Sequence, residues 1–225
     1  MEKSTKIALG VSITAILITA AVIFRKRIKS TINKGSVSKS ASKLALSEWK
    51  HWAKGSIKEG NSSTMKRLTD YWVQGGGVNW DAKKMTDEAW SAAFISYLMK
   101  KSGAGNNFKY SISHSEYIRD AVKNRKEGNN KTFRAFRPQE VKIEVGDLVC
   151  YPRQSGVSFD KTGSYMSHCD IVTTVNKLEA LSIGGNISDS VSQTKLPLNS
   201  KGFIDKSKDG KSYGGYFAVI KNLSK

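Results

Sequence analysis

The chain opens with an unbroken apolar stretch before its pattern becomes amphipathic. Residues 7–24 are 18 residues without a charge, and a helix rising about 1.5 Å per residue could cross most of a roughly 30 Å hydrocarbon core with them. Residues 1–6 are basic, as they are in a cleaved signal peptide. A second basic cluster directly follows the apolar stretch, and this cluster favours an uncleaved anchor. The sequence therefore predicts a transmembrane helix or signal anchor over 7–24 and a flexible basic linker over 25–43.

The next part of the chain has apolar residues at helical spacing. Four helices are expected, over 44–54, 62–73, 86–101 and 113–126. Thr86 is the expected N-cap of the third helix, with acidic residues in its first turn. Ser113 and Glu116 form a capping-box pattern at the start of the fourth.

Short apolar runs separated by turn residues replace this pattern after Gly128-Asn129-Asn130. They predict strands over 133–136, 147–151, 169–175, 178–183 and 216–220. Helices followed by antiparallel strands indicate an α+β domain over residues 44–225. The length of 225 residues and the 39% hydrophobic content suit one such domain with an appendage.

The net charge of +18 narrows the classes of partner. Residues 1–43 hold nine Lys/Arg and one Glu, so the remaining residues are strongly basic as well. Such a surface attracts nucleic acid, anionic lipid or an anionic cell-wall polymer, or only adds solubility. Nucleic acid is not expected, because no binding motif is present and the basic residues are not interleaved with aromatic ones. The sequence does not define an oligomeric state.

Cysteines and histidines are scarce. The two cysteines are too few for a disulfide framework, and their spacing is not that of a zinc motif. With only three histidines and no His-Glu-x-x-His pattern, we expect no metal site and no cofactor.

A candidate nucleophile and a candidate base lie far apart in the sequence. Ser91 falls near the start of the predicted helix 86–101, where free backbone N–H groups can hold an oxyanion. His168 is expected on a strand and could be the general base. Either Asn186, after the next strand, or Asp170, two residues on and on the same face, could orient the imidazole. Cys169 then points to the opposite face.

Each of these residues also has an ordinary structural interpretation. Ser91 can be a small packing residue, His168 a histidine satisfied by a carbonyl, and Gly-Gly-Asn before Ile187 a turn. His114 could face the same cleft as a substrate-binding residue or simply belong to a helix cap. Trp80 and Trp90 could line a ligand groove or pack in the core.

The order and spacing of these pieces resemble known families. The run Ser91-Ala92-Ala93-Phe94-Ile95 resembles the Cys-Ser-Gly-Phe-Val run of NlpC-type and CHAP-type peptidoglycan amidases and endopeptidases. Residues 146–149 match their Gly-Asp-Leu-Val strand, residues 168–172 match their histidine strand, and Asn186 stands where they carry a polar orienting residue. More closely, nearly all of residues 44–225 resembles the bacterial domain of unknown function 2272.

This resemblance implies a papain-like fold, in which a helical half packs on a small antiparallel sheet. It implies peptidoglycan or another anionic cell-wall polymer as the partner and a periplasmic or extracytoplasmic domain, whereas the basic residues after 7–24 favour the cytoplasm. In the implied fold the strands of Cys150 and Cys169 are neighbours, so these residues could form a cross-strand disulfide, which would indicate an oxidising compartment, or remain two buried thiols, which would suit the cytoplasm.

Serine in place of the cysteine of these families is the main departure. A serine hydroxyl is far less acidic than a thiol and needs a well-aligned base. Two hypotheses stay open. One is a membrane-anchored hydrolase that acts by acyl transfer through Ser91 with His168, and the other is a noncatalytic cell-wall-binding or structural module, such as a component of a phage particle or secretion machine. A basic anchored protein that binds nucleic acid or anionic lipid leaves Ser91 and His168 unexplained.

Overall fold

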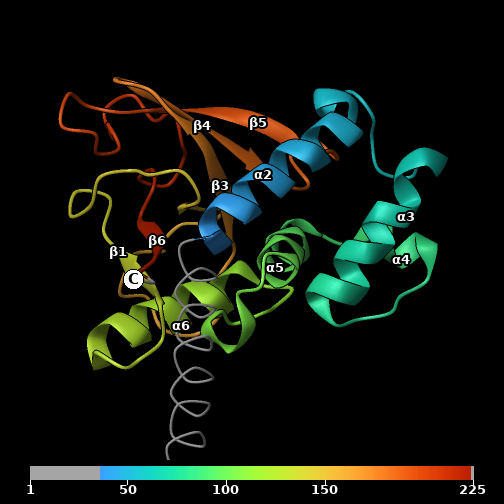
Figure 1. The fold of residues 1–225 in the computed structure, drawn as a ribbon, viewed down its shortest axis with the longest axis horizontal. Helices are drawn as coiled ribbons and strands as arrows, with labels where there is room; N and C mark the ends of the chain where they lie inside the picture. The colour runs from blue at the N-terminus through green and yellow to red at the C-terminus, as the bar shows by residue number, and fades with distance from the viewer. Residues whose placement is uncertain (1–35, 224–225) are drawn as a thin grey trace, which may run out of the picture. The chain divides into compact units, whose positions relative to one another are not determined.

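A six-stranded antiparallel sheet forms the centre of residues 36–223, the part of the chain that the computed structural model describes (Figure 1). The strand order is β1-β6-β2-β3-β4-β5. The strands are β1 (Phe133–Phe136), β2 (Leu148–Pro152), β3 (Ser167–Val175), β4 (Glu179–Gly184), β5 (Ser192–Pro197) and β6 (Ala218–Asn222). Strands β2, β3 and β4 are therefore adjacent, which brings the residues at their ends together.

The helices come first in the chain. They are α2 (Ser36–His51), α3 (Ser62–Asp70), α4 (Ala82–Asp87), α5 (Ser91–Lys101) and α6 (His114–Glu127). Short 3-10 turns lie at Ala53–Gly55 and Gly105–Asn107, and a π-helical segment, Tyr71–Gly76, continues α3. Gly75 in this segment has no room for a side chain, because an added Cβ would lie 2.2 Å from the backbone oxygen of Ala93 in α5. This close approach packs the π-helical segment against α5.

Alternation along the strands divides the apolar side chains between two cores. Leu148 and Cys150 of β2 belong to the larger core, which the helices fill with side chains such as Phe94. The intervening Val149 and Tyr151 belong to a smaller core on the opposite face of the sheet. The sheet is thus covered on both sides, and α5 and α6 are fixed against it by the larger core.

The predicted fold class needs one correction. The structure is α+β, with helices packed on an antiparallel sheet. Within residues 36–223, however, no helix has the length and apolar character needed to cross a membrane. The helix expected over 7–24 lies outside the described residues.

The expected linker ends earlier than predicted. Residues 36–43 are the first turns of α2, and Val37 and Ala41 are buried in the larger core. Lys39 and Lys43 on the same turns are exposed. Because the apolar positions here are small and few, the segment resembles a polar linker in sequence, although its spacing of four residues gives α2 a buried side.

The expected helix 86–101 is two helices. Asp81 caps α4 by accepting a hydrogen bond from the backbone N–H of Lys84, and Glu88 is extended after its last turn. Thr86 therefore lies inside α4 and is not an N-cap. The new helix, α5, begins at Ser91 itself. Ser113 precedes α6 as expected, but its side chain caps no backbone N–H.

Candidate active site

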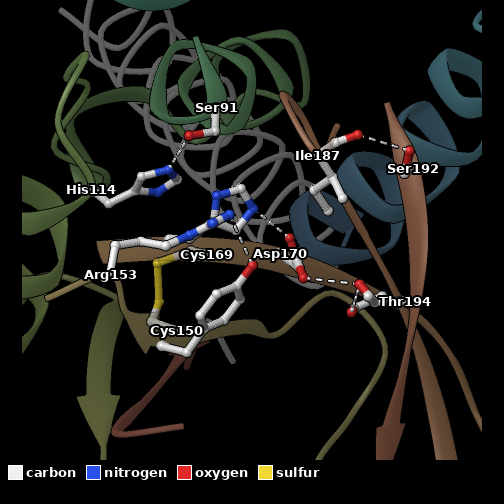
Figure 2. A network of polar contacts seen from close by, with 12 residues as sticks. Ser91, His114, Cys150, Arg153, Cys169, Asp170, Ile187, Ser192 and Thr194 are labelled. Atoms are coloured by element: carbon white, nitrogen blue, oxygen red, sulfur yellow. Dashed lines mark hydrogen bonds and ion pairs between the residues drawn. A yellow bond between two sulfur atoms is a disulfide. The ribbon is translucent and has the colours of Figure 1, made fainter. Parts of the chain in front are cut away.

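Ser91 and His114 are each the first residue of a helix, α5 and α6 respectively. The Oγ of Ser91 lies 2.7 Å from Nε2 of His114 (Figure 2). Nδ1 of the same imidazole is hydrogen-bonded to the hydroxyl of Tyr117, one turn further along α6. Both side chains are buried, with 7% of Ser91 and 5% of His114 exposed. Two helix starts thus hold a hydroxyl and an imidazole in direct contact.

The start of α5 leaves backbone donors beside this hydroxyl. The first backbone hydrogen bond of the helix runs from the N–H of Phe94 to the carbonyl of Trp90. No side chain caps the N-terminus at Trp90. The N–H groups of the first turn therefore have no partner within the helix, and a developing negative charge near Ser91 Oγ would be stabilised there.

A second histidine lies next to the first. The ring centroids of His114 and His168 are 5.0 Å apart. On β3, Nε2 of His168 is 2.8 Å from Oδ1 of Asp170, and Oδ2 of Asp170 accepts a hydrogen bond of 3.1 Å from Thr194 of β5 (Figure 2). His168 and Asp170 are both nearly fully buried.

Gly184, opposite Asp170 at the end of β4, makes room for this pair. A Cβ at Gly184 would lie 2.0 Å from Oδ1 of Asp170 and 2.9 Å from Nε2 of His168. A Cβ at the next residue, Gly185, would lie 2.7 Å from both Phe94 and Trp90 of the helical half. The two glycines allow the end of β4 to pass between the histidine strand and α5.

The environment sets the charge of these groups. Burial lowers the pKa of His114 well below its usual value, and the nearby His168 and Arg153 lower it further. The imidazole of His114 is therefore neutral at pH 7 and can accept a proton. Burial raises the pKa of the Asp170 carboxyl, but the adjacent His168, together with Lys211 and the hydrogen bond from Thr194, outweighs burial and holds that pKa below its usual range.

Ser91, His114 and His168 line one pocket of about 570 Å³. Its remaining lining residues are Ala89, Ile112, Ser113, Arg153, Gln154, Ser164, Tyr165, Met166, Ser167 and Asn186. None of them is acidic, and residues 36–223 contain no group of three or more His, Cys, Asp or Glu side chains suited to a metal ion. The polar groups that line the pocket are therefore serine and tyrosine hydroxyls, two side-chain amides, two imidazoles and one guanidinium.

One comparison with known proteins gives a match. A family model described as "Uncharacterized protein conserved in bacteria (DUF2272)" matches residues 49–221. The chain belongs to the DUF2272 family. No curated protein and no solved structure matches it. The two hydrogen-bonded pairs of this DUF2272 domain that contain a histidine, Ser91–His114 and His168–Asp170, lie within the matched residues.

The structure of the DUF2272 domain pairs the predicted catalytic residues differently. Ser91 is hydrogen-bonded to His114, not to His168. Of the two candidates for orienting His168, Asp170 forms the hydrogen bond. Asn186 lines the pocket and has a left-handed backbone with φ of 55°. His114, expected at most to bind substrate, is the direct partner of the hydroxyl.

The two tryptophans proposed for a ligand groove do not line this pocket. Trp90 is fully buried, stacked on Trp52 and Tyr71 at centroid distances of 5.1 and 5.6 Å. Trp80 is partly buried against Trp72, with the ammonium group of Lys84 over its ring. Both residues follow the ordinary interpretation, which is packing.

Cys150 and Cys169 form a disulfide bridge. They are directly opposite each other on β2 and β3, and the next pair along the two strands is Tyr151 and His168. The disulfide lies on the face of the larger core, while His168 and Asp170 alternate with Cys169 and point to the other face. The bridge thus ties together the two strands that carry His168 and lead to Arg153.

Two functional candidates of the DUF2272 domain are not predicted by the sequence pattern. Tyr117 lies three residues after His114, a spacing that places two side chains on one face of a helix. Arg153 directly follows β2 and lines the pocket. The spacing of Tyr117 could have been noticed, whereas the place of Arg153 depends on the pairing of β2 with β3.

Proposed function

We propose that this domain is a hydrolase that transfers an acyl group to Ser91. The observation that carries the proposal is the 2.7 Å contact between Ser91 Oγ and Nε2 of a buried, neutral His114 at the wall of an open pocket. A serine nucleophile needs a base within hydrogen-bond reach and donors for the oxyanion. Both are supplied here, by His114 and by the uncapped start of α5.

In the first step the Ser91 hydroxyl attacks the carbonyl carbon of an amide and gives its proton to Nε2 of His114. The N–H groups at the start of α5 stabilise the negative oxygen that forms. The C–N bond then breaks, the leaving amine takes the proton from the His114 imidazolium, and an ester on Ser91 remains. Tyr117 holds Nδ1 of His114 and so keeps Nε2 directed at the hydroxyl.

Hydrolysis of the ester requires a base for water. His168 is suited to this step, because Asp170 holds Nε2 as a donor and the described residues offer no hydrogen-bond partner for Nδ1. Nδ1 of His168 takes a proton from water as the water attacks the ester. The tetrahedral intermediate collapses as the bond between its carbon and the Ser91 oxygen breaks. The His168 imidazolium returns its proton, through water, to that oxygen, and the acid is released.

Peptidoglycan is the substrate that we propose. This choice rests on the resemblance of residues 91–95, 146–149 and 168–172 to NlpC-type and CHAP-type amidases and endopeptidases, and on the net charge of +18, which suits an anionic polymer. The bond cleaved would be an amide of the peptide moiety.

Labelling of the full-length protein with a neutral alkyl fluorophosphonate tests the proposed nucleophile. We expect covalent modification of Ser91, located by peptide mass spectrometry. Ser91→Ala abolishes it, and His114→Gln slows it by roughly 10²–10⁴-fold, the usual contribution of a general base. Ser164→Ala is the matched control, because Ser164 lines the same pocket without a histidine partner.

The companion measurement is the release of new amino groups from purified peptidoglycan, with the same variants. Labelling of Ser91 without any release of amino groups would contradict peptidoglycan as the substrate, but it would remain consistent with acyl transfer to Ser91. If Ser91 is not labelled and Ser91→Ala retains binding to peptidoglycan, the domain is a noncatalytic binding module and the hydrolase proposal fails.

A further inference from the structure

Arg153 has no anionic partner among the residues that the structure describes. Of the six arginines in residues 36–223, four form ion pairs with carboxylates: Arg67, Arg119, Arg125 and Arg137. Arg134 donates to two backbone carbonyls. Within this part of the chain, the guanidinium of Arg153 has one hydrogen bond, to the hydroxyl of Tyr151 at 3.4 Å. An arginine without a carboxylate partner can still form two charge-assisted hydrogen bonds to a bound anion.

The guanidinium is held at the pocket, although its charge is unpaired. The backbone N–H of Arg153 donates to the carbonyl of Met166 (3.0 Å), and the Gln154 side chain accepts from the N–H of Met166 (2.8 Å). The guanidinium also lies 5.3 Å from the ring centroid of Tyr151. Figure 2 shows the side chain crossing the site below His114. Its direction is therefore set by β2 and by the segment leading into β3.

The pocket around Arg153 is suited to an anion with an apolar part. Arg153 is the only arginine among the lining residues, which include no lysine and no carboxylate. Two exposed apolar side chains line the same pocket, Met166 with 61% and Ile112 with 38% of the surface accessible. A ligand with a carboxylate and a short aliphatic group would satisfy all three residues.

We propose that Arg153 binds a free carboxylate of the substrate, and that the pocket takes N-acylated amino acids or peptides carrying this carboxylate close to the bond that is cleaved. The cleavage itself rests on the proposed function, whereas the binding of the carboxylate does not. Two parallel N–H···O bonds from the guanidinium would fix the orientation of the acid and with it the position of the neighbouring amide.

Binding of a carboxylate would also act on the base. The positive charge of Arg153 contributes, after burial and His168, to the lowered pKa of His114. A bound carboxylate offsets that charge, so the pKa of His114 rises toward its usual value and the imidazole becomes a stronger base. A substrate with the carboxylate therefore helps to activate the hydroxyl that attacks it.

Binding can be measured without turnover, by following the methyl signal of Met166 in NMR spectra of the full chain labelled at its five methionine methyl groups. Met166→Leu assigns the signal. The probes are N-acetyl-alanine and its neutral analogue N-acetyl-alaninamide, titrated into wild type and Ser91→Ala. We expect the carboxylate to shift the Met166 signal with saturation and to bind roughly 10-fold to 100-fold more tightly than the amide, the usual effect of a hydrogen bond to a charged group.

Variants separate a carboxylate site from general attraction to a basic protein. Arg153→Gln should weaken the binding of N-acetyl-alanine by the same factor and leave the binding of N-acetyl-alaninamide unchanged. Arg153→Lys should retain only part of the affinity for N-acetyl-alanine, because a lysine cannot form the two parallel hydrogen bonds. Lys201→Gln removes the same charge from an exposed position that does not line the pocket, and should have no effect.

Two results would overturn the inference: equal affinity for the acid and the amide, or an acid affinity that Arg153→Gln leaves unchanged. Absence of any saturable shift by N-acetyl-alanine would overturn it as well. None of these results depends on Ser91 as a nucleophile, because the titration in Ser91→Ala reports binding alone. Failure of the fluorophosphonate labelling and failure of carboxylate binding are therefore distinct outcomes.

Discussion

His114 combines two effects that favour its neutral form. Its side chain is buried, which penalises the imidazolium, and it stands at the first residue of α6, where the positive end of the helix dipole opposes a cation. The Ser91 hydroxyl faces the same nitrogen that must accept the proton. A neutral imidazole is the form that catalysis by general base requires, so the environment that makes His114 a weak base also keeps it available.

The pH dependence of fluorophosphonate labelling checks this account. Because the pKa of His114 lies well below 6.5, the rate should stay on its plateau as the pH falls through 6.5 and should decline only in more acidic buffer, where His114 becomes protonated. The rate is to be followed by mass spectrometry of the Ser91 peptide. The slow residual labelling of His114→Gln should lack this decline.

A decline centred at or above pH 6.5 in wild type would mean that His114 is not held neutral by its surroundings. If the decline persisted in His114→Gln but vanished in His168→Gln, the base for Ser91 would be His168.

Strands β2 and β3 are joined by their backbone ladder and by the Cys150–Cys169 bridge. The two cysteines are separated by 19 positions in the sequence, and the segment between them contains both Arg153 and His168. In the chain-entropy description, such a bridge stabilises the fold by limiting the freedom of the unfolded chain. Its expected effect is on the free energy of unfolding and not on the chemistry of the hydroxyl.

Replacing both cysteines with serine should lower the free energy of unfolding by about 3 kcal/mol, a typical value for a loop of this length. Urea denaturation followed by tryptophan fluorescence measures the change. Wild type unfolded in the presence of a thiol reductant should match the variant, and the rate of Ser91 labelling in buffer should be unchanged. A stability equal to that of the oxidised wild type would contradict this role of the bridge.

The elements that the sequence reveals are those with a strong periodic pattern. The expected strands that became β2, β3, β4 and β6 were recognised because apolar residues dominate them. Strand β5, Ser192–Pro197, was missed, because its residues are mostly polar and its ladder with β4 depends on tertiary pairing. The break between α4 and α5 was missed because the extended backbone at Glu88 leaves no signal in the pattern of apolar residues.

The sequence predicts most residues of the candidate site, but it does not predict which of them are hydrogen-bonded to each other. Ser91, His168 and Asp170 could be named from sequence order, since a helix start and a strand carry them. The histidine that contacts Ser91 is determined by the packing of the start of α6 beside the start of α5. Ser91 and His114 are 23 residues apart in the sequence, and no local pattern encodes their contact. The sequence therefore indicates His114 only as a possible binding residue.

One buried ion pair connects distant parts of the domain. Nζ of Lys221 in β6 is 2.6 Å from Oδ2 of Asp147, which also accepts a 2.8 Å hydrogen bond from the N–H of Glu144. The same ammonium group contacts the Glu144 carboxylate at 2.9 Å. Burial raises the pKa of Asp147 to about 6, although the charge and hydrogen bond of Lys221 lower it. The folded domain therefore binds a proton at Asp147 more readily than the unfolded chain does.

This difference predicts how stability changes with pH. Between pH 3.8 and about 6 the folded protein holds more of the Asp147 proton than the unfolded protein, so this group stabilises the fold in acid and loses that contribution as the pH rises through about 6. The loss should be on the order of 1–3 kcal/mol, from a shift of about two pKa units. Carboxyls with lowered pKa values, such as Glu140 and Asp205, change stability in the opposite direction over acidic pH, so wild type alone does not isolate the effect.

The double variant Asp147→Asn, Lys221→Met isolates it, because both charges of the pair are removed together and no unpaired ammonium remains buried. Urea midpoints of wild type and variant are compared across this pH window. The stability of wild type relative to the variant should fall as the pH rises, since only wild type loses the bound proton. A constant difference would mean that Asp147 titrates at its ordinary value in the folded protein, and that Lys221 compensates its burial completely.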